Sequence, residues 1–294
     1  MVTGASGFTG RHLLLAARSA GYHCTAFGQA HDSRSNSADC FKAVNFVEMG
    51  ALARELEDSN PDYIIHLAAI SSIVHGNIRE IYEVNQLHTL NLLQAIKISE
   101  VPVKKILLVS SGNIYGGRDK MPITEADEPK PANHYGVAKY AMELVARQYL
   151  DLPIVITRPF NYTGRGQADK FLIPKIVGAF RNKAPSIELG NLDISRDFSD
   201  VRDVVEAYLR LIKTQKTELV YNVCSGHSTP LSEIITSLGG IAGYEINVKQ
   251  NQSFVRSNDV KELWGSPTLL EHTVGKFRRY SLNETLMWMY TQSV

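Results

Sequence analysis

The sequence alternates short β-rich runs with helical patterns. The β-rich runs are YHCTAF, YIIHLA, KKILLVSS, LPIVITRP and LVYNVCS, and between them stand helical patterns such as YEVNQLHTLNLLQAIKIS and YGVAKYAMELVARQYL. Strands that alternate with helices form a parallel sheet covered on both faces, because each return crossover needs a helix-length connection. The pattern therefore predicts an α/β fold with a doubly wound parallel Rossmann sheet.

The alternation loosens beyond Asn161, and the stretch from Ser228 to the end has few clean strand patterns. A chain of 294 residues that is 44% apolar is long enough to bury a sizeable core in one or two joined lobes. We expect a dinucleotide-binding domain over 1–160, to which 196–225 return. A smaller substrate-binding lobe is expected over 161–195 and 226–294.

Three glycines, Gly4, Gly7 and Gly10, precede the apolar run at 13–17. A backbone without side chains can approach a pyrophosphate closely at the start of a helix, so the loop reads as a phosphate cradle, although ordinary turns also contain spaced glycines. Only three residues stand before Gly4, where a buried strand is usual. We expect either that upstream residues are missing or that the central strand is very short and weakened.

Composition excludes several functions. The 31 basic and 30 acidic residues balance, which argues against a nucleic-acid partner. No apolar run approaches the ~18 residues of a membrane span, and since the first residues show no charged stretch followed by an apolar region, we do not expect secretion. The three cysteines lack CxxC spacing and the nine histidines form no HxxxH pair, so neither disulfides nor a metal site is expected. These features favour a cytoplasmic protein with no membrane partner.

Polar residues follow the run KILLV, and a YxxxK pair comes later. Ser111 stands just after that run, and Tyr135 and Lys139 are four residues apart, which puts them on one face of a helix. A phenol pKa of about 10 is too high for ready proton exchange at neutral pH, and a nearby cation lowers it. We therefore expect Lys139 to lower the pKa of Tyr135; the alternative is a tyrosine packed in the core.

Several strings match one family in order: TGASGFTG, HLAA, SSGNIYG, YGVAK, RPFNYTGRGQ and RDFSDVRDV. By these motifs the chain resembles the extended short-chain dehydrogenase/reductase family of nucleotide-sugar epimerases, dehydratases and reductases. The resemblance implies that Tyr135 is the catalytic acid/base, Lys139 its electrostatic partner and ribose ligand, and Ser111 a hydrogen-bond donor to the reacting oxygen. The other implied cofactor-binding residues are Gly4, Gly7, Phe8, Thr9, Gly10, Arg34, Leu67, Ala68 and Ala69.

The segment after YHCTAF bears on the choice of cofactor. NAD-specific Rossmann proteins have an acidic residue about 20 residues past the glycine loop, whereas this chain has Gly28 and Gln29. His31, Ser33 and Arg34 follow and are suited to a 2′-phosphate, which favours NADP(H). Because Asp32 is acidic, NAD(H) remains an alternative cofactor. His31 and Arg34 are equally well interpreted as solvated loop residues.

The residues after Ser111 bear on the reaction. Family dehydratases carry an Asp-Glu pair there, because removal of water needs a base and an acid; this chain has Gly112 and Asn113. Hydride chemistry remains, in a ketoreductase or in a 4-epimerase with tightly bound NAD. A non-catalytic dinucleotide-sensing protein is a third reading, against which the intact Ser-Tyr-Lys set argues.

Within the family, the strings GNLDISRDFSDVRDV and RPFNYTGRGQ resemble the GDP-4-keto-6-deoxymannose reductases, which make GDP-D-rhamnose. That resemblance implies NADP(H)-dependent reduction of a 4-keto group. The family resemblance also implies a homodimer built from two helices of each subunit, although the apolar stripes of these helices are equally suited to packing inside the subunit. The implied substrate-binding residues are Ser111, Asn113, Asn161, Lys175, Arg196 and Arg256. The alternative for each of the two arginines is a surface ion pair.

Overall fold

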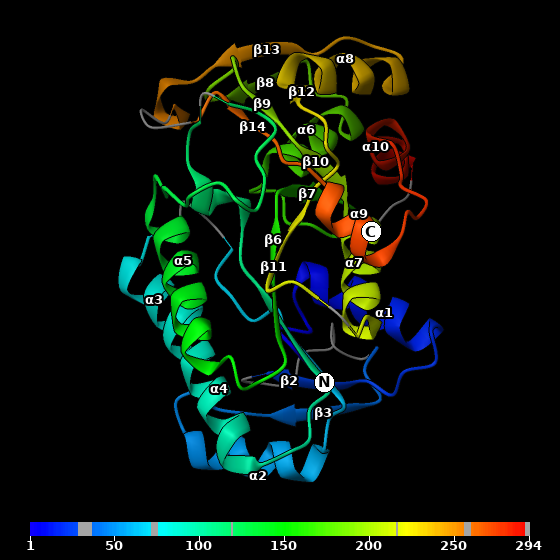
Figure 1. Cartoon of the computed structure of the whole chain (residues 1–294). Helices are drawn as coiled ribbons and strands as arrows, with labels where there is room; N and C mark the ends of the chain where they lie inside the picture. Colours follow the sequence, from blue (N-terminus) through cyan, green and yellow to red (C-terminus); the bar gives the residue numbers. More distant parts are fainter. Residues whose placement is uncertain (29–36, 72–75, 119, 216, 256–259, 292–294) are drawn as a thin grey trace.

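The computed structural model describes residues 1–28, 37–71, 76–118, 120–215, 217–255 and 260–291. Its centre is a parallel sheet of seven strands in the order β11-β6-β5-β4-β1-β2-β3 (Figure 1). The strands are β1 (Val2–Thr3), β2 (Thr25–Gly28), β3 (Cys40–Ala43), β4 (Tyr63–His66), β5 (Lys105–Val109), β6 (Ile154–Pro159) and β11 (Val220–Val223). The predicted doubly wound α/β fold is confirmed.

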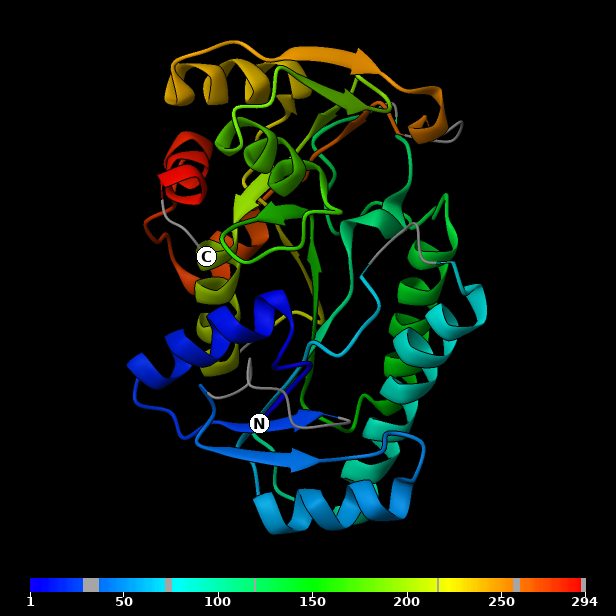
Figure 2. The ribbon, with the colours of Figure 1, turned by 180° about the vertical axis from the view of Figure 1, so that it is seen from behind.

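Helices cover both faces of this sheet, as Figures 1 and 2 show from opposite sides. One face packs against α1 (Phe8–Ser19), α7 (Val201–Lys213) and α9 (Thr268–Val274), and the other against α2 (Met49–Ser59), α4 (His88–Ser99) and α5 (His134–Ala146). Successive residues of a strand point to opposite faces. Accordingly, Leu107 of β5 joins the first core, whereas its neighbours Ile106 and Leu108 join the second.

The central strand β1 contains only two residues, as its short sequence led us to expect. Val2 pairs with Ala26 of β2 and with Ile65 of β4, so even this short strand is bonded on both sides. The strand order reverses here, since β2 lies on one side of β1 and β4 on the other. In such sheets ligands bind outside the carboxyl ends of the strands at this switch point.

A third apolar core lies above the carboxyl ends of the strands (Figure 1). It is built from α6 (Leu172–Arg181), β8 (Ser186–Leu189), α8 (Leu231–Ala242), β13 (Asn247–Gln250) and α10 (Leu282–Thr291). Short strands connect it to the main sheet: β7 (Asn161–Thr163) pairs with β10 (Phe198–Asp200), and β9 (Ser195–Arg196) pairs with β12 (Thr229–Pro230) and β14 (Glu262–Leu263). The remaining elements are α3 (Ile78–Tyr82), the π-helical turn η2 (Glu83–Leu87), and the 3₁₀ turns η3 (Gly112–Tyr115), η4 (Arg147–Tyr149) and η5 (Gln252–Phe254).

Within the residues that the structure describes, no helix is long and apolar enough to cross a membrane.

Candidate active site

The glycine loop joins β1 to α1, and each of its glycines has a different environment. Gly4 has a φ of +66°, and a Cβ there would lie 2.7 Å from the Ala68 nitrogen. At Gly10 a Cβ would lie 2.6 Å from the Ala5 Cα. Neither position accepts a side chain, because both contacts are with backbone that cannot step aside.

Gly7 differs because it borders open space. A Cβ there would meet only the Gly4 carbonyl, at 3.1 Å. Gly7 is also the N-cap of α1 and supplies no side-chain cap, so the first N–H groups of the helix have no capping partner. Free N–H groups at the positive end of a twelve-residue helix, next to bare backbone, fit the pyrophosphate of a dinucleotide.

The backbone that follows β4 is fixed by a buried polar chain. The Ala68 N–H donates to Thr3 Oγ1 at 3.1 Å, Thr3 Oγ1 bonds His66 Nδ1 at 2.7 Å, and His66 Nε2 bonds Thr89 Oγ1 at 3.0 Å. Burial lowers the pKa of His66 to about 3, so the ring is neutral and serves both neighbours. The predicted cofactor residues Leu67, Ala68 and Ala69 follow this chain and are half-buried.

Asn85, in the π-helical turn η2, fixes the same segment from the other side. Its Oδ1 accepts the Ile70 N–H at 2.8 Å, and its Nδ2 donates to the Ile70 carbonyl at 3.0 Å. Sequence analysis missed both Asn85 and His66. For His66 the available signal was a polar residue inside the apolar run YIIHLAA, which is typical of a buried hydrogen-bonding role, whereas Asn85 stands among polar neighbours and gave no such signal.

Helix α1 is tied to the segment 161–167 by three side chains from its first two turns, and Phe8 stacks on the Tyr162 ring. These bonds join the phosphate loop to the segment that begins with Asn161. They are Thr9 Oγ1 to Tyr162 Oη at 2.8 Å, Arg11 to the Gly166 carbonyl at 2.6 Å, and His12 Nε2 to the Arg165 carbonyl at 2.9 Å.

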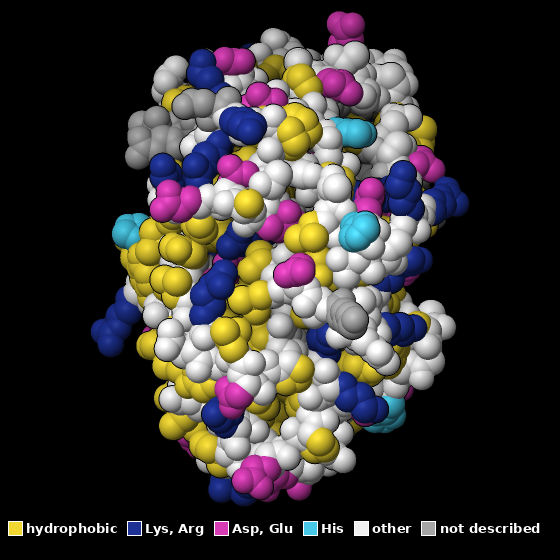
Figure 3. Space-filling model, in the orientation of Figure 1, with side chains coloured by type: hydrophobic (Ala, Val, Ile, Leu, Met, Phe, Trp, Pro, Cys, Tyr) yellow, Lys and Arg dark blue, Asp and Glu magenta, His cyan; other side chains and the backbone are white. Residues whose placement is uncertain are grey.

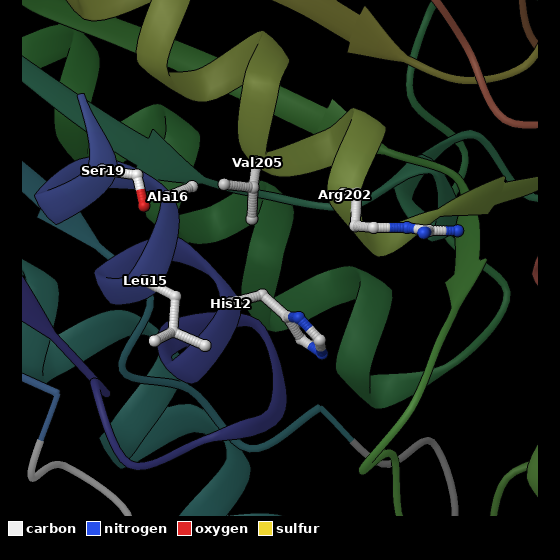
Figure 4. Close-up of a pocket in the computed structure, with 6 residues that line it drawn as sticks. All are labelled: His12, Leu15, Ala16, Ser19, Arg202 and Val205. Atoms are coloured by element: carbon white, nitrogen blue, oxygen red, sulfur yellow. The ribbon is translucent and has the colours of Figure 1, made fainter. Parts of the chain in front are cut away.

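The outer side of α1 borders a hollow of about 230 Å³ against α7 (Figure 4). Its lining residues are His12, Leu15, Ala16, Ser19, Arg202 and Val205. The guanidinium of Arg202 is already bonded to Asp200, at 2.6 and 2.9 Å, so it is not free for an anionic ligand. This hollow contains none of the predicted catalytic residues.

Ser111, Tyr135 and Lys139 meet at the carboxyl end of β5. Tyr135 lies in the first turn of α5, is almost fully buried and is hydrogen-bonded with Ser111. One turn on, Lys139 Nζ donates to the Val109 carbonyl at 2.7 Å. Both side chains of the YxxxK pair therefore face the same strand end, as helical spacing predicts.

The expected lowering of the Tyr135 pKa is wrong for this structure. Burial raises the pKa of the phenol above its usual range, and the hydrogen bond with Ser111 only partly opposes this. Lys139 is not among the groups that shift this pKa, and its ammonium is directed to the Val109 carbonyl. Burial lowers the pKa of Lys139 to about 8, against the charge of Glu143, which raises it.

Asn113 lies beside the catalytic serine. Its backbone N–H and its Nδ2 both donate to Ser111 Oγ, each at 3.1 Å. These bonds occupy both lone pairs of the oxygen, so Ser111 can reach Tyr135, or a substrate oxygen in its place, only as a hydrogen-bond donor. At Gly112 a Cβ would come within 3.1 Å of the Phe160 ring, so a larger residue there would have to displace it.

Two of the predicted substrate residues are close to each other. Asn161 pairs with Phe198, two residues after Arg196, and both Asn161 and Arg196 lie where β6 leads into the third core. The Asn161 Nδ2 is buried with no hydrogen-bond partner among the described residues, which suits a ligand group. Arg196 is buried and donates to the Ser195 and Lys261 carbonyls at 2.8 and 3.0 Å.

Lys175 lies apart from these residues, on α6. Its Nζ donates to the Glu188 carbonyl at 2.7 Å and stands 4.4 Å from the centre of the Phe254 ring. Of the other predicted binding residues, Arg34 and Arg256 lie outside the described residues, as do Gln29, His31, Asp32 and Ser33. Among the residues that are described, no group of three or more His, Cys, Asp and Glu side chains is suited to a metal ion.

Fold and site together define a dinucleotide-binding protein of the Rossmann type. Comparison with known families gives a match to the NAD dependent epimerase/dehydratase family over residues 1–224. The chain belongs to this family, so the predicted extended dehydrogenase/reductase membership and the enzymatic class that goes with it are confirmed.

Similar proteins include GDP-6-deoxy-D-talose 4-dehydrogenase of Aggregatibacter actinomycetemcomitans, 34% identical over 99% of this chain and 96% of the relative. GDP-6-deoxy-D-mannose reductase of Pseudomonas aeruginosa is 33% identical over 97% and 93%. Among solved structures, RMD from Pseudomonas aeruginosa complexed with NADPH has 32% identity and a TM-score of 0.84 over 99% and 96% of the two chains. A Burkholderia cenocepacia J2315 structure, provisionally described as an epimerase, has 42% identity and a TM-score of 0.91 over 98% and 95%. These findings support a nicotinamide dinucleotide, NAD(H) or NADP(H), as the cofactor.

Proposed function

We propose that this protein is an NADP(H)-dependent reductase of the 4-keto group of a GDP-4-keto-6-deoxyhexose and that its product is GDP-D-rhamnose. The observation that carries the proposal is the meeting of Ser111, Tyr135 and Lys139 at one strand end, with Gly112 and Asn113 where a dehydratase needs two acids. The names of the two similar proteins, a dehydrogenase and a reductase of GDP-6-deoxyhexoses, support the substrate class.

The site residues suit reduction of a carbonyl. When bound, the dinucleotide supplies the hydride that adds to the carbonyl carbon. Ser111 donates a hydrogen bond to the carbonyl oxygen, and Tyr135 transfers its phenolic proton to that oxygen as the carbon is reduced. Burial raises the pKa of Tyr135, so the phenol keeps its proton at neutral pH and is ready to act as the acid. The alkoxide that forms is a much stronger base than phenolate and takes the proton.

The groups proposed to hold the sugar nucleotide are Asn161 and Arg196, with Asn113 and Ser111 at the reacting end. The unpartnered Asn161 amide and the buried guanidinium of Arg196 support this, because an arginine fork matches phosphate oxygens. Arg34 for the 2′-phosphate, Arg256 for the diphosphate and Lys175 as a further anion ligand are proposed on the sequence alone.

We also propose that 1–160 and 196–225 form the dinucleotide-binding domain and that 161–195 and 226–294 form the substrate-binding lobe. Separate apolar cores around the sheet and above it support the division, except at α9, whose Leu270 packs in the core of the sheet. A cytoplasmic homodimer is proposed as well. Hydrophobic side chains gather over α3 and α5 in Figure 3, and Leu87, Ile98 and Leu144 of this helical layer are exposed.

The test supplies purified protein with GDP-4-keto-6-deoxymannose and NADPH. We expect one NADPH to be oxidised per sugar nucleotide, and NMR of the product to show the configuration of GDP-D-rhamnose at C4. A product with the configuration of GDP-6-deoxy-D-talose would overturn the proposed stereochemistry. Interconversion of sugar nucleotides without consumption of NADPH would identify an epimerase instead. Tyr135→Phe should be inactive, and Tyr140→Phe on the same helix should be active.

A further inference from the structure

A buried ion pair lies beneath the catalytic helix. Arg158 of β6 and Glu143 of α5 have side chains that are 3% and 0% exposed, and they form a two-pronged contact. Arg158 Nε donates to Glu143 Oε1 at 3.0 Å, and its NH2 donates to Oε2 at 2.7 Å. Isolated from water, such a pair contributes little net stability relative to well-packed apolar residues, so its presence calls for another explanation.

The pair is connected to the segment that carries the catalytic serine. The remaining nitrogen of Arg158 donates to Tyr115 Oη at 2.8 Å, and Tyr115 donates to Asn222 Oδ1 at 2.8 Å. Tyr115 ends η3, the turn for which Ser111 is the N-cap. The guanidinium therefore joins α5, which bears Tyr135 and Lys139, to the turn that positions Ser111.

Glu143 stands one helical turn beyond Lys139 and on the same face of α5. Lys139 is buried, and the groups that face it are few. Tyr135 and Glu143 face it from its own helix, the Val109 carbonyl from β5, and the neutral ring of His66 from β4. Glu143 is the negative charge in this set.

Beyond Glu143, the charges belong to Arg158 and to Glu125, which accepts the Asn222 N–H at 2.7 Å. Burial lowers the pKa of Lys139 to about 8, and the charge of Glu143 opposes this. Without an anion one turn away, a dry pocket would favour the neutral amine. Without Arg158, the carboxylate itself would be an unpaired buried charge and would take up a proton.

We propose that Glu143, held ionised by Arg158, keeps the Lys139 ammonium charged beside Tyr135, so that the pair acts as positioning residues for the proton-transferring couple. The effect of the pair on proton transfer rests on the proposed reductase function, whereas its effect on the charge of Lys139 does not. It assigns a role to two residues, 15 positions apart in the sequence, that need not touch substrate or cofactor.

The decisive experiment follows the charge of Lys139 directly. The protein is labelled with ¹³C-lysine, and the Cε resonance of Lys139, identified by its loss in Lys139→Met, is titrated with pH. The test variant is Glu143→Gln with Arg158→Met, which removes both charges together and leaves neither partner as an unpaired ion. The control is Glu206→Gln with Arg210→Met, which removes an exposed ion pair on α7.

We expect the Lys139 midpoint to fall by about one pH unit in the test variant and to stay unchanged in the control. With GDP-4-keto-6-deoxymannose, the pH at which kcat/KM is half-maximal should move by the same interval. An unchanged Lys139 midpoint in a folded test variant would overturn the proposal and leave the pair a purely structural feature. A shifted midpoint in a protein that reduces no sugar nucleotide would instead refute the proposed function and uphold the electrostatic role.

Discussion

Replacing Gly7 and Gly10 of the glycine loop by alanine should have different effects on stability and on cofactor binding. At Gly7 the backbone angles, φ −69° and ψ 172°, are ones that alanine adopts freely, and a methyl group meets only the Gly4 carbonyl at 3.1 Å. We expect Gly7→Ala to change the free energy of unfolding by less than about 1 kcal/mol. The methyl group would nevertheless occupy the space where the pyrophosphate must approach. NADPH affinity should therefore fall about 10- to 100-fold, or about 1.4 to 2.8 kcal/mol.

Gly10→Ala, unlike Gly7→Ala, should clearly lower the free energy of unfolding. Its Cβ would lie 2.6 Å from the Ala5 Cα, inside contact distance with backbone. The loop and α1 have to separate, at a cost of about 1–3 kcal/mol typical of overpacking. The melting temperature should fall clearly, and affinity should fall as a consequence.

Two measurements on each variant separate these effects. Thermal unfolding without ligand reports stability, and calorimetric titration with NADPH reports affinity. Gly240→Ala in α8 serves as a control, since its φ is not positive and no atom lies within 4 Å of its Cβ position. A Gly7→Ala protein that binds NADPH as tightly as the wild type would refute the assignment of the loop as the phosphate cradle.

Three further predictions concern single side chains. Tyr135→Phe should lower kcat by about 10²- to 10⁴-fold with little change in NADPH affinity, as steady-state kinetics and titration would show, because only the proton donor is removed. Tyr115→Phe should cost about 1–3 kcal/mol in a denaturant titration, because Asn222 Oδ1 loses its donor in a buried site. Burial raises the pKa of Asp203 to about 7, so the folded state takes up a proton and stability falls as the pH rises from about 4 to about 7. Asp203→Asn should remove that fall and gain about 1–2 kcal/mol at pH 8, after allowance for solvent screening, and equal pH profiles of melting temperature for both proteins would contradict this.

Most of the sheet was predictable because most of its strands have a recognisable apolar, β-rich pattern in the local sequence. All five β-rich runs form parallel strands in the central sheet. The edge strand β3 was missed, since Cys40–Ala43 is half-exposed and carries a lysine, which weakens the apolar pattern. The pairing of β8 with β13 was also not predictable, because it joins residues about 60 positions apart through packing in the third core.

The catalytic trio was predictable from spacing, but its electrostatics were not. Helical periodicity puts Tyr135 and Lys139 on one face whatever surrounds them. Whether the pKa of Tyr135 is raised or lowered depends on how completely the fold excludes water from the phenol. The local sequence pattern does not contain that information. The Arg158–Glu143 pair escaped notice for a related reason, because its partners come from separate elements that meet only in the folded chain.

The three bonds between α1 and the segment 161–167 have a consequence for engineering. Two of them end on backbone carbonyls, of Arg165 and Gly166. The bond to Arg165 does not depend on that residue's side chain, whereas Gly166 has a φ of +79° and a Cβ there would lie 2.9 Å from the Arg11 guanidinium, so it has to stay a glycine. The bond from Thr9 to Tyr162 depends on both side chains. A chimera that takes its upper lobe from a relative therefore has to carry Thr9 and Tyr162 together and to keep a glycine at position 166.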